Sequence, residues 1–432
     1  MRKSHLATLI ATAVFSLGAH GADLLQVYQQ ALTNDAQYAS ARSTLAAAQE
    51  RIPQAKSALL PNVSFSGSNT RFEAQSRGGS NGSEYNLTLV QQVYNPALLE
   101  QVEQSKLSVS VSENQFALAK QDLILRTAQA YFDVLSAEEA LRFTKAQKEA
   151  TTEQLASAKR NFEVGTQTIT DTHEAQAAYD LVVAQEFAAI NDLEVRRTAL
   201  LQIIGQIPAS IANLKPGVTL NAPQPAKIDA WVETAEKQSN NVIIAQINVE
   251  TAKREITKDR LGHRPTANVR ANSNYAASNP LFNIGSSPNR TTNSITLNWN
   301  VPIFSGYAVT SRVREAILLE EKARFDLENA KRSAAQSARQ AFLTVNSGLA
   351  QVKALEAAEV SSKSSLDSNK LGYTVGVRIN IDVLNAQRQL FSTQRDLARA
   401  RFDTIVNGLR LKAAAGGLRE EDLAAVNGLL QK

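Results

Sequence analysis

Two long stretches of helix-favouring sequence constrain the fold of this chain more than any other feature. One runs from Pro96 to Val164 and the other from Gly306 to Thr374, and neither contains an internal proline. Each is 69 residues long, which corresponds to roughly 100 Å of α-helix. Helices of ordinary globular domains are far shorter. Each stretch must therefore pack against other helices along its whole length.

Four shorter helical stretches accompany the long ones, at residues 23–60, 169–206, 229–262 and 380–415. The last contains apolar residues at seven-residue intervals, which is typical of a coiled coil. These residues are Val383, Leu390, Leu397 and Leu411, with Thr404 as the weak member, and Leu384, Phe391, Ala398 and Ile405 on the neighbouring register. A parallel row of small or short side chains comprises Ala386, Thr393, Ala400, Asn407 and Ala414. The broad face and the row of small residues predict close packing in a ring of helices.

Four segments alternate apolar and polar residues with a period of two, which is typical of β-strands with two unlike faces. They lie at residues 62–68, 85–90, 267–275 and 294–303. In the last of them, Ile295, Leu297 and Trp299 share one face, and the residues between them are Thr and Asn. The segments between paired strands, at about 69–83 and 276–292, are rich in Gly, Ser, Asn and Arg, and we expect them to be loops.

The two halves of the chain repeat the same order of elements, which indicates an internal duplication. Each repeat consists of a helix, a β-hairpin, a long helix and a short helix. The first repeat is predicted at 22–215 and the second at 216–432, joined by a proline-containing linker around 207–228. The predicted hairpins lie at about 61–94 and 265–304, and the long helices at 96–164 and 306–374.

Residues 1–21 have the features of a secretory signal peptide. A basic start is followed by an apolar stretch at residues 6–17 and by small residues around Gly21. No later apolar run reaches the ~20 residues that a transmembrane helix needs. We therefore expect an exported protein that is either soluble or inserted as a β-barrel, whose strands carry a weaker hydropathy signal.

Composition disfavours several functional classes. The chain contains no cysteine, so a thiol nucleophile is excluded. Only His173 and His263 follow the predicted signal peptide, and they are far apart, so we expect neither a metal site nor a cofactor. The net charge of +5 is small for this length and argues against nucleic-acid binding. No serine–histidine–aspartate or paired-carboxylate arrangement can be identified, so the chain is not expected to be an enzyme.

The polar faces of the strands allow two interpretations. In a soluble protein, the polar face of a sheet packed on helices would simply face water. In a membrane barrel, strands of ~10 residues cross the bilayer and the polar face lines the lumen. Four strands are too few to close a barrel, but two copies would supply eight strands and three copies twelve. The long helices would then extend from the barrel as a coiled-coil tube, and the strand pattern only favours the trimer.

Several short motifs, in order, resemble the TolC family of outer-membrane efflux and secretion channels over essentially the whole mature chain. They are DLLQVYQQA at 23–31, SALLPNVSFS at 57–66, AYFDVLSAEEALRFTKAQKEA at 130–150, FEVGTQTITD at 162–171, LGHRPT at 261–266, YTVGVRINIDVLNAQ at 373–387 and GGLREEDLAAVNGLL at 416–430. The fold class that the resemblance implies is mainly α with a β-barrel part. A homotrimer would form a twelve-stranded barrel in the outer membrane of a Gram-negative bacterium, continued by a periplasmic α-helical tunnel.

The resemblance also implies a function and partners. The channel would export drugs, toxic metabolites or proteins as the exit duct of tripartite efflux pumps and type I secretion systems. Its partners would be a periplasmic adaptor protein, an inner-membrane RND, MFS or ABC transporter, and outer-membrane lipid. The tunnel would be closed at its periplasmic tip and would open when the adaptor and transporter dock.

The resemblance implies roles for residues near the two glycines that follow the long helices. Gly165 and Gly376 would form the turns at the closed tip. The family positions that link neighbouring helices there correspond to Gln154, Thr170, Asp171, Tyr373 and Arg378. The expected links are an ion pair between Asp171 and Arg378 or a hydrogen bond between Asp171 and Tyr373.

Asp382 corresponds to a ring of acidic side chains at the constriction of the family's tunnel. One helical turn farther on, the family pattern has a second acidic residue, whereas this chain has Asn385. Three copies would then carry three constriction carboxylates instead of six, which predicts a weaker preference for cations. Without the resemblance, Asp171 and Asp382 are explained by the helix dipole, which favours a carboxylate near a helix start.

The main alternative is an exported coiled-coil scaffold or adhesin with small β-caps and no pore. Such a protein would be soluble without detergent, whereas a channel would fractionate with the outer membrane. Trp231 is expected in the core. Candidates for aromatic girdles at the membrane faces are Tyr85, Tyr94, Tyr275, Trp299 and Phe304.

Overall fold

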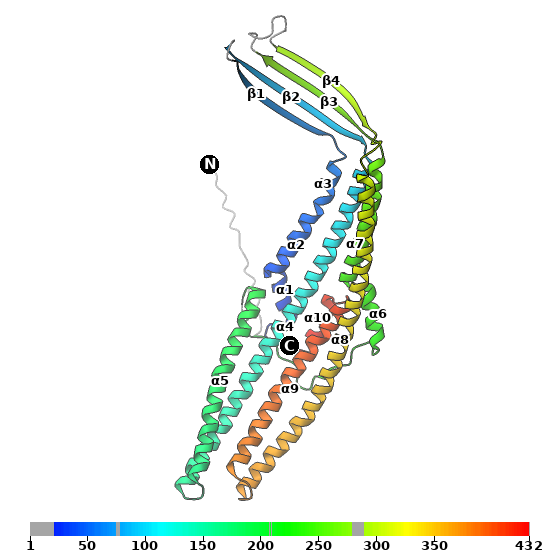
Figure 1. Cartoon of the computed structure of the whole chain (residues 1–432). Helices are drawn as coiled ribbons and strands as arrows, with labels where there is room; N and C mark the ends of the chain where they lie inside the picture. Colours follow the sequence, from blue (N-terminus) through cyan, green and yellow to red (C-terminus); the bar gives the residue numbers. More distant parts are fainter. Residues whose placement is uncertain (1–20, 75–77, 207, 209, 279–288, 432) are drawn as a thin grey trace, which may run out of the picture.

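The computed structural model describes residues 21–74, 78–206, 208, 210–278 and 289–431. All but the last residue of the predicted signal peptide lies outside the described residues. The molecule is elongated, with a β-sheet at one end and helices that run to the other end (Figure 1). The helices of the first half are α1 (Leu24–Asn34), α2 (Ala36–Gln49), α3 (Arg51–Ser57), α4 (Pro96–Glu163) and α5 (Ile169–Ile204). Those of the second half are α6 (Ile228–Gln238), α7 (Asn240–Arg260), the short 3₁₀ helix η1 (Leu261–His263), α8 (Ala308–Thr374), α9 (Asn380–Ala414) and α10 (Glu420–Asn427).

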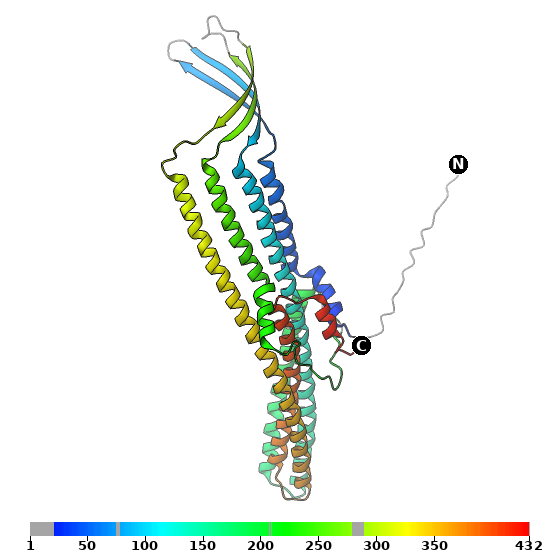
Figure 2. The same ribbon diagram turned by 90° about the vertical axis from the view of Figure 1, so that its right-hand side faces the viewer.

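The two long helices form the axis of the molecule, and their prediction is confirmed. α4 begins at Pro96, which is favoured there because the first turn of a helix does not need its N–H. α8 begins two residues later than predicted, because Gly306 and Tyr307 have left-handed backbones with φ of 59° and 64°. α5 packs antiparallel against α4, and α9 against α8 (Figures 1 and 2).

The helical stretches predicted at 23–60 and 229–262 are each divided into shorter helices. In the first, Asp35 has an extended backbone, and its carboxylate accepts a hydrogen bond of 2.6 Å from the N–H of Tyr38, which starts α2. In the second, Ser239 has an extended backbone between α6 and α7. The pieces stack along the upper halves of α4 and α8, so that they still act as one composite rod in each repeat.

The strands β1 (Asn62–Ala74), β2 (Gly78–Tyr94), β3 (Thr266–Ser278) and β4 (Asn289–Asn300) form one antiparallel sheet in this order. The register confirms the predicted alternation of faces. One row across all four strands is apolar and consists of Val63, Leu89, Ala271 and Ile295. The adjacent row is polar and consists of Ser64, Thr88, Asn272 and Ser294. The sheet therefore has one apolar and one polar face where the strands join the helices.

The prediction of loops at 69–83 and 276–292 is wrong for most of the described residues in these ranges, because they belong to the strands. β1 continues to Ala74 and β2 begins at Gly78, and all of these residues pair across the hairpin. Glycine, serine and asparagine hide the alternation in the sequence, but their backbone groups pair as well as any others. β4 ends at Asn300, earlier than predicted, and Pro302 lacks the N–H that a strand would need.

The largest hydrophobic core lies partway along the helices, where α1, α4, α5, α9 and α10 meet the linker between the repeats. Tyr28, Tyr131 and Phe132 are fully buried in it. The hydroxyl of Tyr131 donates a hydrogen bond of 2.7 Å to the C=O of Ala212, which ties the linker to α4. The helix α10 was not predicted as a separate element, although it anchors the end of the chain to this core.

A smaller core under α6 confirms the prediction for Trp231. Its side chain is buried against Phe342 and Val345 of α8 and Leu411 of α9. The indole N–H donates a hydrogen bond of 2.8 Å to the C=O of Pro225. Trp231 therefore joins the linker to both helices of the second hairpin.

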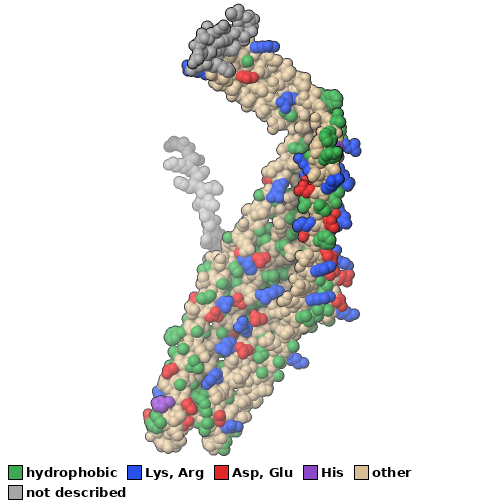
Figure 3. Space-filling view, in the orientation of Figure 1, with side chains coloured by type: hydrophobic (Ala, Val, Ile, Leu, Met, Phe, Trp, Pro, Cys, Tyr) green, Lys and Arg blue, Asp and Glu red, His purple; other side chains and the backbone are tan. Residues whose placement is uncertain are grey.

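Charged side chains are distributed unevenly over the surface. On the face shown in Figure 3 they cover the helices, whereas the described part of the sheet carries few of them. Among the described residues, no helix is both long and apolar enough to cross a membrane.

The coiled-coil register predicted for 380–415 is confirmed by the packing of α9 against α8. Its five members are all buried, namely Val383, Leu390, Leu397, Thr404 and Leu411. The threonine interrupts the apolar row at a close helix crossing. A Cβ atom on Gly348 of α8 would lie 2.6 Å from the Oγ1 of Thr404. The small residues at this crossing are what allow the two helices to approach.

Gly408→Ala is expected to stabilise the protein. Gly408 lies within α9, and a Cβ atom there would have no neighbouring atom within 4 Å. Alanine is favoured over glycine in a helix interior by about 1 kcal/mol, so the free energy of unfolding in chemical denaturation should rise by a similar amount. Gly348→Ala is the matched control on α8, and it should destabilise by about 1–3 kcal/mol because its methyl group collides with Thr404. Equal effects of the two substitutions would contradict this description of the helix crossing.

Candidate functional site

The two turns farthest from the sheet contain the residues to which the sequence assigned a function. One joins α4 to α5 at residues 164–168, and the other joins α8 to α9 at 375–379. We call these turns and the adjoining ends of the four helices the tip. The two turns lie at the same end of the molecule in Figures 1 and 2, and α5 contacts α9 there.

The first turn is held by its own hydrogen bonds. Gly165 has a φ of 78°, and the N–H of Thr166 donates to the C=O of Asn161 at 2.8 Å, which ends α4. The hydroxyl of Thr168 accepts from the N–H of Asp171 at 3.3 Å, and the carboxylate of Asp171 accepts from the N–H of Thr168 at 3.0 Å. This reciprocal pair is a capping box. The helix-start role expected for Asp171 is therefore observed.

The second turn has the same backbone path but no capping box. Gly376 has a φ of 81°, and the cap position of α9 is occupied by Ile379, whose side chain has no acceptor. Asp382 therefore does not take the capping role that Asp171 takes. Its carboxylate lies 3.7 Å from the guanidinium of Arg378. Because both side chains are partly exposed, this ion pair contributes at most about 1 kcal/mol.

Two hydrogen-bonded contacts join the α4–α5 hairpin to the α8–α9 hairpin at the tip. In the first, the amide of Gln154 donates to the Oδ1 of Asn380, and the amide of Asn380 donates to the C=O of Asp171 at 3.3 Å. In the second, the amide of Gln167 donates to the hydroxyl of Tyr373. Asn380 is almost completely buried, so that its loss would leave polar groups without partners.

The structure places only some of the predicted tip residues in contacts between the hairpins. Gln154 and Tyr373 take part in the contacts between hairpins, whereas Thr170 and Asn385 are exposed. Within the described part of one chain, the carboxylate of Asp171 makes neither the expected ion pair with Arg378 nor the expected hydrogen bond with Tyr373. The same links between neighbouring copies stay a prediction.

Sequence reasoning missed Gln167 and Asn380. Their contacts join segments that are more than 200 residues apart in the chain, and such a contact leaves no periodic pattern. One signal was available for Asn380. The equivalent position in the first repeat is Ile169, so the second repeat has exchanged an apolar residue for an amide at the start of a helix.

The chemistry of the tip favours reversible contacts between helices. Its polar groups include amides, hydroxyls, carboxylates and the guanidinium of Arg378, and several of them contact one another or nearby backbone. His173 is an exposed residue in the first turns of α5. In the ranges that the structure describes, no group of three or more His, Cys, Asp or Glu side chains could hold a metal ion.

Aromatic side chains form two groups along the strands. The group nearest the helices comprises Tyr94, Trp299, Phe304 and Tyr307, and the distal group comprises Phe65, Tyr85 and Tyr275. The distal rings stack in sequence across three strands, with centroids 6.2 and 6.3 Å apart. Along β2, Tyr85 and Tyr94 are separated by a length of about 30 Å at ~3.3 Å per residue. For a tilted strand, this separation suits aromatic girdles at the two faces of a bilayer.

Both edges of the sheet are open in the described chain. β1 pairs only with β2, and β4 pairs only with β3. Unpaired edges of this length are templates for further strands. Because β1 and β4 run in opposite directions, β4 of one copy beside β1 of the next would continue the antiparallel order.

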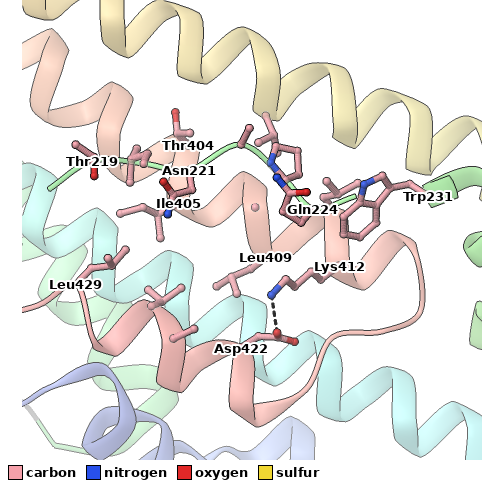
Figure 4. Close-up of a pocket in the computed structure, with 18 residues that line it drawn as sticks. Thr219, Asn221, Gln224, Trp231, Thr404, Ile405, Leu409, Lys412, Asp422 and Leu429 are labelled. Carbon is pink, nitrogen blue, oxygen red and sulfur yellow. Dashed lines mark hydrogen bonds and ion pairs between the residues drawn. The ribbon is translucent and has the colours of Figure 1, made fainter. Parts of the chain in front are cut away.

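The linker between the repeats covers a cavity of ≈ 370 Å³ on α9 and α10 (Figure 4). Residues 219–224 form one wall, and Trp231 lies at one end of it. Lys412 of α9 and Asp422 of α10 form an ion pair of 2.6 Å in its lining. This ion pair joins α9 to α10, and the cavity lies between these helices and the linker.

Known proteins with similar sequence or structure include outer-membrane proteins and a secretion protein. The family model "outer membrane efflux protein" matches residues 27–206 and 231–417. The chain is 33% identical to outer membrane protein TolC of Escherichia coli (strain K12) over 430 residues, which cover 97% of this chain and 87% of TolC. It is 27% identical to the proteases secretion protein PrtF of Dickeya chrysanthemi over 436 residues, covering 96% of this chain and 93% of PrtF. The structure of the Campylobacter jejuni CmeC outer membrane channel shares its fold, with a TM-score of 0.77, 19% identity and coverage of 93% and 88%.

Proposed function

Because this chain belongs to the outer membrane efflux protein family, the TolC family, we propose that it is the outer-membrane exit duct of an efflux pump or a type I secretion system. One observation carries the proposal. A single chain joins strands of membrane-spanning length to helices of about 68 residues, which end in a hydrogen-bonded tip. The protein is located in the outer membrane of a Gram-negative bacterium, and its helices extend into the periplasm.

The functional assembly is a homotrimer. Each chain supplies four strands with two open edges, and three copies would close a barrel of twelve strands. The row of Ser64, Thr88, Asn272 and Ser294 would face the lumen, and the apolar row would face lipid. The exposed apolar side chains on the outer faces of α5 and α8 are suited to packing against neighbouring copies.

The duct works with a periplasmic adaptor and an energised inner-membrane transporter. We infer that the transporter is of the RND, MFS or ABC class and that its cargo is drugs, toxic metabolites or proteins. In the described residues, the tip is held by hydrogen bonds, exposed ion pairs and small apolar clusters such as that of Leu366 and Val383. Adaptor docking at the tip can therefore change the population of the open state only through its binding energy.

The tip acts as a gate. The contacts of Gln154 with Asn380 and of Gln167 with Tyr373 hold the two hairpins of each copy together, and the family links from Asp171 would join neighbouring copies. Individually these contacts contribute only about 0.5–1.5 kcal/mol each. A gate made of several weak contacts can be held shut at rest and opened by a docked partner.

Asp382 is proposed to set the ion preference of the constriction. Replacing Asn385 by Asp would double the number of carboxylates near the axis, so the cation permeability relative to anions should rise and block by trivalent cations should need roughly ten-fold less blocker. Asp382→Asn should change both quantities in the opposite direction. Reversal potentials and current block in planar bilayers measure these effects. Asn407→Asp on the same helix but far from the tip is the control, and a change as large as that of Asn385→Asp would contradict the assignment.

A deletion strain tests the function as a whole. Loss of the protein should lower the drug concentrations that inhibit growth, or remove a protein from the culture medium, and the wild-type chain should restore the phenotype. The purified protein should also conduct ions in planar bilayers. An unchanged strain together with a non-conducting protein would contradict the proposal. The pore-free scaffold or adhesin considered above is not retained, because the relatives are outer-membrane channels and secretion proteins.

A further inference from the structure

A set of basic residues surrounds the junction between the sheet and the helices. The chain crosses this junction four times, at residues 56–61, 94–96, 259–266 and 305–315. These segments contain five basic residues, Lys56, Arg260, Arg264, Arg312 and Arg314, against the two acidic residues Asp259 and Glu315. We call the five basic residues the collar. The collar side chains are exposed, and in the described chain none of them has an ion pair or a side-chain hydrogen bond.

The collar segments of the second repeat lie against one another. A Cβ atom on Gly262 would be 3.2 Å from the Cγ2 of Val309, so η1 packs on the first turn of α8. Arg260 and Arg264 flank this contact on one side, and Arg312 and Arg314 follow it on the other. Lys56 lies in the last turn of α3, just before β1. In a closed ring, β1 follows β4 of the neighbouring copy, so Lys56 would continue the collar between copies.

The collar lies directly beside the aromatic group that marks one face of the proposed membrane. Ile303, Phe304 and Tyr307 are 93%, 73% and 74% exposed, and Trp299 is 74% exposed. Figure 3 shows apolar side chains gathered where the sheet meets the helices, with Lys and Arg side chains immediately below them. Aromatic rings prefer the headgroup level of a bilayer. Basic residues on the helical side of these rings are therefore at the depth of lipid phosphates.

We propose that the collar binds the headgroups of anionic phospholipids in the membrane leaflet that faces the helices. The inference rests on the proposed membrane location of the strands, and it adds a ligand class and a site to it. Unpaired guanidinium groups are well suited to phosphate, because they can donate two parallel hydrogen bonds to its oxygens. The neighbouring cations in the chain below the collar, such as Lys258 and Arg254, are paired with glutamates and are not available in this way.

The fluorescence of Trp299 offers a direct test with the full-length protein in lipid bilayers. Trp299 and Trp231 are the chain's two tryptophans, and Trp231 is buried in the helical part, so that lipids should quench only Trp299. Brominated phosphatidylglycerol should quench Trp299 more strongly than brominated phosphatidylcholine at equal mole fraction. We expect a binding preference on the order of five-fold, the effect of one basic side chain close to a lipid surface.

Removing the collar charges should abolish the preference. In the variant Arg260→Gln, Arg264→Gln, Arg312→Gln and Arg314→Gln, the two lipids should quench Trp299 equally. The matched control removes four exposed cations of α8 and α9 instead, with Lys353→Gln, Lys363→Gln, Lys370→Gln and Arg388→Gln, and it should retain the wild-type preference. Equal quenching by both lipids in the wild type, or a preference that survives the collar substitutions, would overturn the proposal. Absence of quenching by either lipid would instead contradict the membrane location itself.

Discussion

Replacing Tyr373 by Phe together with Arg378 by Glu is expected to raise the mean conductance of the reconstituted channel at least several-fold. The first substitution removes the hydroxyl that accepts the hydrogen bond from Gln167. The second removes the ion pair with Asp382 and places two carboxylates within one helical turn of each other. Both changes weaken the closed tip and leave the barrel untouched.

The size of the effect follows from the energies of these contacts. A hydrogen bond contributes about 0.5–1.5 kcal/mol net, and an exposed ion pair at most about 1 kcal/mol. Their combined loss in each copy is therefore worth about 2 kcal/mol, which changes the ratio of open to closed channels more than ten-fold. Several copies opening together would enlarge the change further.

Asn380→Ala is a second, independent test of the proposed gate. This side chain contacts both Gln154 and the backbone of Asp171, so that its loss removes both hydrogen bonds of one contact between the hairpins. Single-channel recordings in planar bilayers should show longer or larger openings for this variant too. The control is Tyr179→Phe with Arg388→Glu, the same chemical changes on α5 and α9 away from the contacts. Conductance that stays at the wild-type value in both tip variants would rule out the gate.

Arg126→Met should destabilise the protein by about 3 kcal/mol, the largest loss of stability that we expect from a single substitution. The guanidinium of Arg126 donates to both carboxylate oxygens of Asp35, at 2.9 and 3.1 Å, and to Asp122 at 2.6 Å. The side chain of Asp35 is only 5% exposed. Removal of one partner from a buried ion pair leaves the other charge without compensation, which costs about 3–5 kcal/mol. We expect a loss at the lower end of this range because the side chain of Arg126 is 29% exposed.

A double variant separates the lost ion pair from the lost packing. Asp35→Asn keeps an acceptor for the N–H of Tyr38 but carries no charge, so that Asp35→Asn combined with Arg126→Met should recover much of the stability that Arg126→Met alone loses. Arg332→Met is the matched control, since Arg332 and its partner Glu328 are both exposed. It should change the free energy of unfolding by less than about 0.5 kcal/mol in chemical denaturation. If Arg332→Met lost as much stability as Arg126→Met, the burial of Asp35 would not explain the effect of Arg126→Met.

The same ion pair makes stability depend on pH. Burial alone would raise the pKa of the Asp35 carboxyl, but hydrogen bonds from Arg126 and from the N–H of Tyr38 outweigh it and lower the pKa below its usual value of 3.8. The stabilisation is complete above that ordinary value and is lost as the pH falls through the lowered pKa. The wild type should therefore lose more stability than Arg126→Met when the pH is lowered below about 4.

The long helices could be predicted nearly to the residue because their ends are marked by unambiguous residues. Pro96 starts one of them, and Gly165 and Gly376 follow their ends with positive φ angles. The breaks at Asp35 and Ser239 were not visible, because one polar residue fits the solvent-exposed face of a continuous helix equally well. The lengths of the strands were underestimated where glycine and serine remove the alternation of apolar and polar residues, although the backbone hydrogen bonds between strands continue through them.

The tip was predictable in its turns and only partly in its contacts. Glycines and helix-start aspartates are local features that can be recognised from their neighbours in the sequence. Contacts such as those of Gln167 and Asn380 depend on how two hairpins from different repeats are placed, and that placement results from packing along the whole length of α4 and α9. The capping box at Thr168 is also a reason why Asp171 and Asp382, which are equivalent by duplication, do not have equivalent surroundings.

The open edges of the sheet have a consequence for inheritance. In the proposed trimer no copy closes its own sheet, so a chain with a damaged β1 or β4 edge would also disable the sound copies that it joins. In a cell that makes equal amounts of sound and damaged chains, random assembly of three copies would leave only about one ring in eight fully sound. Lesions at these edges should therefore be dominant. Lesions that prevent a chain from folding at all, so that it never enters a ring, should be recessive.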